Sequence, residues 1–206
     1  MVRSHWIRPV VVKTVLAVAL VLRGGAAAGA AELVAVPGSG TRFTTTMEAA
    51  AGDKPVKLVL TGVAVRQKLF LNVYAIASYL QEGVRVRTAE ELAAADGLKR
   101  LHLVMERDVD GKDLAQALQA GIRLNYPEPA FGPEVHTLVQ TLQGDKVKKG
   151  DHIFLTHVPG VGLHCSVAGK GGVWIQNPQF SRAVWDIYLG RNHLGDAIKK
   201  GLVSRL

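Results

Sequence analysis

Arg66 and Tyr74 are the polar side chains of this sequence whose types and placement point most directly to ligand binding. Arg66 lies at the end of the apolar, β-branched stretch 57–67, and Tyr74 lies within the next apolar stretch. A guanidinium presents a planar fork of donors that matches a carboxylate, and a phenol adds a donor without adding charge. The pair could therefore hold an acidic head group. A solvated arginine at a strand end and a tyrosine at a sheet edge would give the same pattern.

The histidines and the cysteine do not have the spacing of a metal site. His152 and His157 are an odd number of residues apart on one predicted strand, so their side chains point to opposite faces and cannot share a metal. Ligand spacing is also missing around the other histidines of the predicted domain, which are His102, His136, His164 and His193. Cys165 is the only cysteine and reads as a buried, inert thiol. The sequence predicts neither a metal nor another cofactor.

Two other short motifs do not reach the pattern of a known site. The glycines at 169–172 precede a strand rather than a helix, and no Lys-Ser/Thr follows them, so they indicate a hairpin turn rather than a phosphate-binding loop. Ser166 lacks the Gly-x-Ser-x-Gly setting of a hydrolase nucleophile. The sequence therefore offers no nucleotide-binding loop and no serine nucleophile with a recognisable setting.

The elements that must position Arg66 and Tyr74 are strands and helices separated by Gly/Pro turns. Strands are predicted at residues 41–48, 57–67, 70–80, 99–105, 151–157, 163–167 and 173–175. Helices are predicted from their capping residues and apolar spacing to begin after Thr88, after Asp110, at Pro133 and near Phe180, with a last one at 194–203. Short turns favour an antiparallel sheet over βαβ crossovers. We expect an α+β fold with one large antiparallel sheet and helices packed mainly on one face.

Several separated motifs make this sequence similar to the chalcone isomerase-like family. The resemblance covers residues 41–206 and includes a glycine-led strand ending in Arg, two tyrosine dipeptides, a Gly-Asp pair and a helix ending in Leu-Gly. These motifs are Gly62 to Arg66, Val73-Tyr74, Tyr79-Leu80, Gly150-Asp151 and Trp185 to Gly190. The resemblance implies an open-faced β-sandwich, which agrees with the elements predicted above.

The resemblance implies two different activities. Plant chalcone isomerases close a flavanone ring with an Arg, helped by a Thr, a Tyr and an Asn. Arg66 matches the Arg and Tyr74 falls at the Thr, but Leu114 and Gly121 fall where the Tyr and Asn would be. Neither side chain can hydrogen bond, so the electrostatic stabilisation of such a reaction is missing. The non-catalytic relatives bind fatty acids in plastids through an Arg and a Tyr, and this sequence keeps both.

We therefore expect a non-catalytic protein that binds a small amphipathic acid, a fatty acid, through an Arg66/Tyr74 clamp in an apolar cleft. The candidate lining residues are Ile76, Leu114, Leu118, Gly121, Ile122 and Trp185. Ile76, Leu118, Ile122 and Trp185 would each also fit an ordinary core. One alternative is an isomerase (intramolecular lyase) in which Arg66 polarises a carbonyl or phenolate and Tyr74 donates a proton. A second alternative is a partner-binding module without a ligand.

Residues 1–30 have the organisation of a cleavable signal peptide. A basic start precedes the apolar run 15–22, which is too short to span a bilayer, and small residues stand at 28–30, where a signal peptidase would cut. The alternative is a membrane anchor that stays attached. Cleavage would leave residues 31–206 as one exported domain, periplasmic or secreted, without a stable membrane anchor.

The charge of the chain does not indicate nucleic-acid binding. Four of the basic residues belong to the leader, so its removal lowers the formal net charge from +8 to +4. The remaining lysines and arginines are scattered among acidic residues, whereas binding to phosphates needs clustered positive charge. A small-molecule acid is the partner that the sequence predicts.

Overall fold

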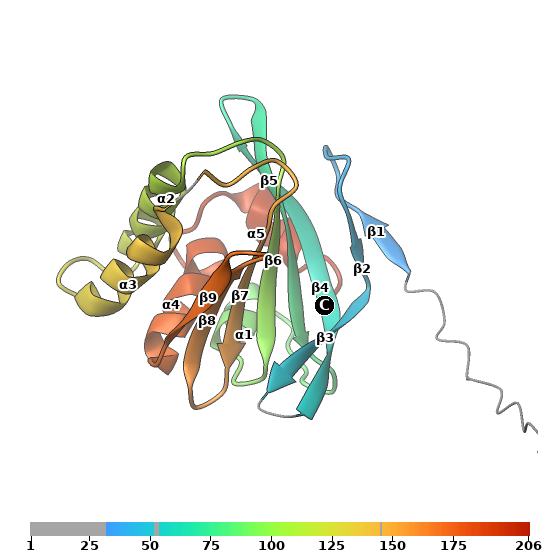
Figure 1. Cartoon of the computed structure of the whole chain (residues 1–206). Coiled ribbons are helices and arrows are strands. Elements are labelled where there is room, and N and C mark those ends of the chain that lie inside the picture. The colour runs from blue at the N-terminus through green and yellow to red at the C-terminus, as the bar shows by residue number, and fades with distance from the viewer. Residues whose placement is uncertain (1–31, 52–53, 145) are drawn as a thin grey trace, which may run out of the picture. The chain divides into compact units, whose positions relative to one another are not determined.

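The computed structural model describes residues 32–51, 54–144 and 146–206, so the predicted signal peptide lies outside the described residues. A seven-stranded antiparallel sheet follows the chain order from β3 to β9 without a crossover (Figure 1). Its strands are β3 (Thr46–Ala51), β4 (Lys54–Lys68), β5 (Leu71–Gln81), β6 (Lys99–Met105), β7 (His152–Val158), β8 (Gly162–Val167) and β9 (Gly171–Ile175). A meander of this kind is what the short turns predict, because adjacent antiparallel strands need only a tight connection.

One predicted strand is divided between two sheets. The stretch expected at 41–48 separates into β2 (Arg42–Thr44), which pairs with β1 (Leu33–Ala35), and β3, which pairs with β4. The division occurs at Thr45, whose N–H donates to Glu32 O at 2.8 Å while its carbonyl accepts from Leu60 N at 2.9 Å. The prediction of a single strand here is wrong because Thr45 bonds to a different partner on each side.

The helices begin at the capping residues expected from the sequence. Thr88 Oγ1 accepts from Glu91 N at 3.1 Å, and Asp110 Oδ1 accepts from Lys112 N at 2.9 Å. These side chains satisfy backbone donors that have no partner inside the helix. The helices are α1 (Ala89–Ala94), α2 (Gly111–Arg123), α3 (Gly132–Leu142), α4 (Pro178–Leu189) and α5 (Asp196–Leu202). None of the described helices is long and apolar enough to cross a membrane.

The sheet buries apolar side chains on both faces. Helices α2, α3 and α4 lie on one side of the sheet, and the β1–β2 pair lies on the other side (Figure 1). The larger core, on the helix side, includes Ile76, Leu103 and Trp185, and the smaller core includes Leu60, Ala77 and Tyr79. The arrangement confirms an α+β fold with a large antiparallel sheet and helices mainly on one face.

A bulge in β4 decides which face of the sheet Arg66 occupies. Leu60 pairs with Tyr79 and Gly62 pairs with Ser78, so Thr61 has no partner in the ladder. Side chains alternate between faces along a strand, and one extra residue reverses the alternation. Leu60 accordingly belongs to the smaller core and Ala64 to the helix-side core. Arg66 follows two residues after Ala64, so the bulge directs it toward the helices.

Candidate ligand-binding site

A cleft of about 420 Å³ lies between α2 and the adjoining ends of β4 and β5. Small-molecule sites commonly occupy about 300–1,000 Å³, so the cleft has room for a small ligand. The lining residues are Arg66, Lys68, Val73, Tyr74, Arg107, Asp108, Val109, Asp110, Asp113, Leu114, Ala117, Leu118, Ala120, Gly121, Leu124 and Leu194. The wall from α2 and its C-cap is mainly apolar between Leu114 and Leu124, whereas charged side chains come from the strand ends, from the β6–α2 loop and from Asp113 in the first turn of α2.

Arg66 brings a largely unused guanidinium to this cleft. Its side chain is half-buried, and Nη1 donates to Leu194 O at 3.4 Å. None of the ion pairs within the described part of the chain includes Arg66. A guanidinium has five N–H donors, so most of the hydrogen-bonding capacity of Arg66 is available to an anion in the cleft.

Tyr74 lies opposite Arg66 in the β4–β5 ladder and is joined to a second tyrosine. Because the two residues are cross-strand partners, their side chains project from the same face of the sheet. Tyr74 Oη lies 3.1 Å from Tyr188 Oη, a hydrogen bond between buried phenols.

Burial raises the pKa of Tyr74, while its hydrogen bond to Tyr188 and the charge of Arg66 oppose the rise. Burial also raises the pKa of Tyr188 well above its ordinary value. Both phenols are therefore neutral donors at physiological pH.

Tyr188 is the part of this cluster that sequence reasoning missed. It lies on α4 behind Tyr74, is fully buried, and does not line the cleft itself. Its spacing on a mostly apolar helix is what any core residue shows. The one sequence signal is its membership of the family-like motif from Trp185 to Gly190.

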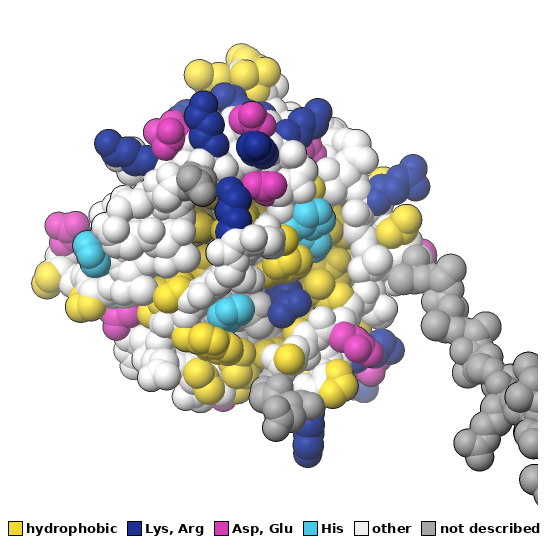
Figure 2. Space-filling view, viewed as in Figure 1, with side chains coloured by type: hydrophobic (Ala, Val, Ile, Leu, Met, Phe, Trp, Pro, Cys, Tyr) yellow, Lys and Arg dark blue, Asp and Glu magenta, His cyan; other side chains and the backbone are white. Residues whose placement is uncertain are grey.

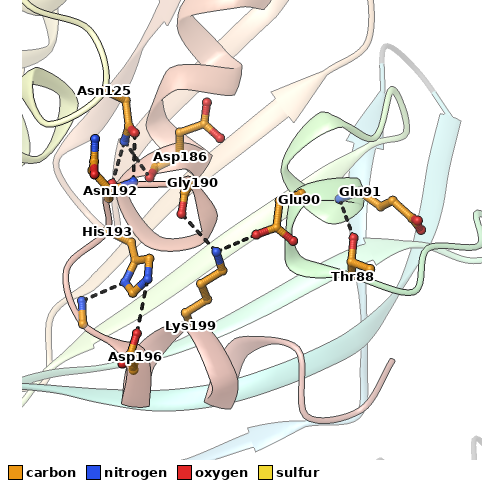
Figure 3. A network of polar contacts seen from close by, with 11 residues as sticks. Thr88, Glu90, Glu91, Asn125, Asp186, Gly190, Asn192, His193, Asp196 and Lys199 are labelled. Atoms are coloured by element: carbon orange, nitrogen blue, oxygen red, sulfur yellow. Dashed lines mark hydrogen bonds and ion pairs between the residues drawn. The ribbon is translucent and has the colours of Figure 1, made fainter.

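The α4–α5 loop, which supplies Leu194, is held by hydrogen bonds from the side chains of Asn125 and Lys199 (Figure 3). Asn125 Nδ2 donates to Asn192 O at 2.6 Å, and Asn192 N donates back to Asn125 Oδ1 at 3.1 Å. Lys199 Nζ donates to Gly190 O at 3.0 Å and to Glu90 Oε1 at 2.6 Å. These contacts fix the backbone carbonyl that receives Arg66, and so help to orient the guanidinium.

The structure brings five of the eight predicted site residues to the cleft. Arg66, Tyr74, Leu114, Leu118 and Gly121 all line it. The other three, Ile76, Ile122 and Trp185, are completely buried in the core and lie outside the lining. All three lie deeper between the sheet and the helices than the cleft extends, and Trp185 packs there against His157 and Lys99.

Gly121 has a packing role that differs from the one expected. From the resemblance to the family, we expect Gly121 to make the cavity more apolar. A Cβ at this position would lie 2.7 Å from Ile187 Cγ2, so the missing side chain permits α2 and α4 to approach each other. The apolar wall itself comes from neighbouring residues of α2, chiefly Leu114 and Leu118.

A second cavity, of about 390 Å³, lies between α2 and α3 and also contains an arginine. Arg123 Nη1 in this cavity donates to Tyr126 O at 3.1 Å and to Ala130 O at 2.5 Å. Its Nε lies 3.7 Å from Glu128 Oε1. Arg123 is thus occupied in holding the α2–α3 connection, whereas Arg66 is not, and the cleft beside β4 is the better anion site.

Strand pairing brings together two histidines that sequence spacing does not connect. His102 Nε2 lies 2.7 Å from His152 Nδ1 across β6 and β7. Burial, followed by His152 and Arg100, lowers the pKa of His102 to about 3. No third ligand joins them, since the described ranges contain no group of three His, Cys, Asp or Glu side chains placed to hold a metal ion.

Comparison with known proteins agrees with the architecture. The family described as chalcone isomerase-like matches residues 35–204. A solved structure with a similar fold is the Arabidopsis thaliana fatty-acid binding protein AtFAP1. It has a TM-score of 0.64 at 17% sequence identity, over 84% of this chain and 96% of that chain. No curated protein matches the sequence.

Proposed function

Because this chain belongs to the chalcone isomerase-like family, we propose that it is a non-catalytic binding protein for a small amphipathic carboxylic acid, specifically a fatty acid. The observation that carries the proposal is the unused guanidinium of Arg66 beside Tyr74 at the edge of an apolar cleft. A structure with the same fold is that of a protein described as fatty-acid binding, which supports this ligand class.

The chemistry of the cleft suits both parts of such a ligand. Arg66 offers charge-assisted hydrogen bonds to the carboxylate, and Tyr74 offers a neutral donor. Leu114, Leu118 and Leu124 offer an apolar wall to the alkyl chain, where burial contributes about 0.8 kcal/mol per methylene. The cleft thus presents donors to the head group and hydrocarbon to the tail.

Paired titrations with a fatty acid and the fatty alcohol of equal chain length test the proposed clamp. We expect Arg66→Ala to weaken binding of the acid by about ten- to a hundredfold, since a hydrogen bond to a charged group contributes about 1.5–3 kcal/mol. Binding of the alcohol should change little. Arg85→Ala, at an exposed arginine in the β5–α1 loop, is the matched control. Equal affinity of the unmodified protein for acid and alcohol would refute the clamp.

The same variants separate binding from catalysis. An isomerase would need polar groups to orient its substrate, and the cleft presents Leu114 and Gly121 at the positions compared with the Tyr and Asn of plant chalcone isomerases. We expect no cyclisation of a chalcone by the unmodified protein. Turnover that disappears in Arg66→Ala would replace the binding proposal with the isomerase alternative.

Export is part of the proposed function. The basic start, short apolar run and small residues of positions 1–30 support a signal peptide that is removed. The intact mass of protein recovered from a periplasmic or extracellular fraction should correspond to a chain that begins near residue 31. Recovery of a chain that still contains residues 1–30 and remains with the membrane would favour the anchor instead.

A further inference from the structure

The β4–β5 hairpin ends in three consecutive exposed apolar residues. The exposed fraction is 83% for Leu69, 98% for Phe70 and 58% for Leu71. The hairpin extends beyond the end of the sheet, and apolar side chains form the end of the domain there (Figures 1 and 2). Isolated exposed apolar residues are common, but a contiguous group at a projecting tip indicates an interaction site.

The geometry of the turn gives no structural reason for these residues. Lys68 pairs with Leu71, so Leu69 and Phe70 form a two-residue loop, and their φ angles are 50° and 65°. Left-handed backbone favours Asn and Gly in such loops and costs roughly 1–2 kcal/mol at other residues. Both side chains also lie outside the two cores. Small polar residues would suit this turn better, so the fold by itself does not account for the apolar tip.

Basic side chains surround the base of this tip. Lys68 adjoins the tip, and Arg107 lines the same cleft as Lys68. Lys148 and Lys149 are exposed on the neighbouring α3–β7 loop, which is joined to the β6–α2 loop by the bond from Lys149 N to Asp108 Oδ1 at 2.9 Å. Figure 2 shows lysine and arginine side chains gathered beneath the apolar tip, with acidic side chains between them.

Acidic side chains also lie on this part of the domain: Asp108, Asp110 and Asp113 line the cleft together with Lys68 and Arg107. The Glu106 side chain accepts hydrogen bonds from Ser39, Thr41 and Asn72. The lysines and arginine are exposed and carry their charge toward solvent. An apolar projection within a basic surround matches the interface of a bilayer, where side chains enter the acyl boundary and cations meet anionic head groups.

We propose that this hairpin docks the protein on a bilayer that contains anionic phospholipid, with Leu69, Phe70 and Leu71 inserted and Lys68, Arg107, Lys148 and Lys149 against the head groups. The cleft lies at the same end of the sheet, since Lys68 and Arg107 both line it, so docking would bring it close to the lipid. The docking goes beyond the proposed fatty-acid binding and does not depend on it.

Site-specific fluorescence tests the docking directly. The full chain carrying Phe70→Cys is labelled with an environment-sensitive fluorophore; Cys165 does not compete because it is buried and its pKa is raised to about 12. Val161→Cys, at an exposed position in the β7–β8 turn at the opposite end of the sheet, is the matched control. Vesicles of phosphatidylcholine with phosphatidylglycerol should shift emission to the blue at position 70 only.

Vesicle co-sedimentation with unlabelled variants measures the contribution of the tip. We expect Phe70→Ser to weaken association by about tenfold or more, as expected from the loss of a buried aromatic side chain. Trp174→Ser, which removes an exposed aromatic residue from β9, should leave association unchanged. Phosphatidylcholine alone should bind less than the mixture, because the basic residues have no anionic partner there.

Three results would overturn the docking proposal. The first is an unchanged emission at position 70 in the presence of vesicles. The second is equal association of Phe70→Ser and the unmodified protein, which would assign any association to other residues, 1–30 included. The third is a blue shift that grows with protein concentration without vesicles, which would make a second copy the occupant. Because no fatty acid is added, failure here leaves the Arg66 titration unaffected.

Discussion

At the scale of single residues, the candidate site depends on the protonation and orientation of three side chains. Arg66 donates to Leu194 O, and Tyr74 and Tyr188 share one hydrogen bond. Burial keeps both phenols neutral, so Tyr188 can donate its hydroxyl proton to Tyr74 while the proton of Tyr74 is available to an acceptor on a ligand. Tyr188 therefore acts through Tyr74 and is a positioning residue.

Replacement of Tyr188 by phenylalanine tests this role. Tyr188→Phe should weaken fatty-acid binding by about three- to tenfold, the equivalent of one ordinary hydrogen bond, because Tyr74 loses the partner that orients its hydroxyl. Tyr79→Phe is the control, since Tyr79 lies on the other face of β5 and donates to Thr44 O at 2.9 Å. Isothermal titration should show the loss for Tyr188→Phe and none for Tyr79→Phe; equal losses would contradict a positioning role.

At the scale of elements, the bulge in β4 and its contact with α5 determine where Arg66 points. Thr61, the unpaired residue, donates through Oγ1 to Ser78 O at 3.1 Å and to Leu202 O at 3.0 Å. The next residue, Gly62, packs directly against the backbone of α5 at Gly201. The bulge is thus held by the last helix as well as by the neighbouring strand β5.

A side chain at position 62 should disturb this contact. Gly62→Ala places a Cβ against the carbonyl oxygen of Gly201, and we expect it to destabilise the protein by about 1–3 kcal/mol, as overpacking does in other cores. Gly40→Ala is the control, because Gly40 is exposed and has no atom within 4 Å of its Cβ position. Urea unfolding of both variants measures the difference. A Gly62→Ala protein as stable as Gly40→Ala would show that α5 does not hold the bulge.

At the scale of the whole molecule, two histidines packed on opposite faces of the sheet favour the neutral form. His157 is 4% exposed, and burial, followed by the charge of Lys99, lowers its pKa to about 4. His102 behaves similarly on the opposite face of the sheet. In the unfolded chain, these histidines would have the ordinary pKa of 6.5. As the pH falls, the unfolded chain would therefore bind protons at a higher pH than the folded protein does.

The free energy of unfolding should consequently fall in mild acid. The pKa of His157 is lower in the folded protein than in the unfolded chain. His157 therefore contributes fully to the free energy of unfolding above about pH 6.5, and this contribution is lost as the pH falls toward 4. The loss for this residue is on the order of 1–3 kcal/mol after allowance for solvent screening. Urea titrations across this pH range should show that the free energy of unfolding depends less on pH in His157→Gln than in the unmodified protein. Exposed His136→Gln is the control; equal slopes for both variants would contradict the prediction.

Much of the architecture could be predicted from the sequence because its determinants are local. Caps at Thr88 and Asp110, the alternation of apolar residues and the Gly/Pro turns act within a few residues of one another. They located all five helices and the strands of the sheet to within a few positions, apart from the short β1 and the division at Thr45. Arg66 and Tyr74 were identifiable for the same reason, as polar residues in apolar strands.

Only the tertiary structure decided how these residues combine. The face on which Arg66 lies depends on the unpaired Thr61, which an alternating pattern does not reveal and which α5 stabilises from more than a hundred residues away. The approach of α4 selects Tyr188 as the partner of Tyr74, and packing depth separates Leu118 in the cleft from Ile76 in the core. Such contacts depend on the positions of distant elements in space, and no periodicity along the chain encodes them.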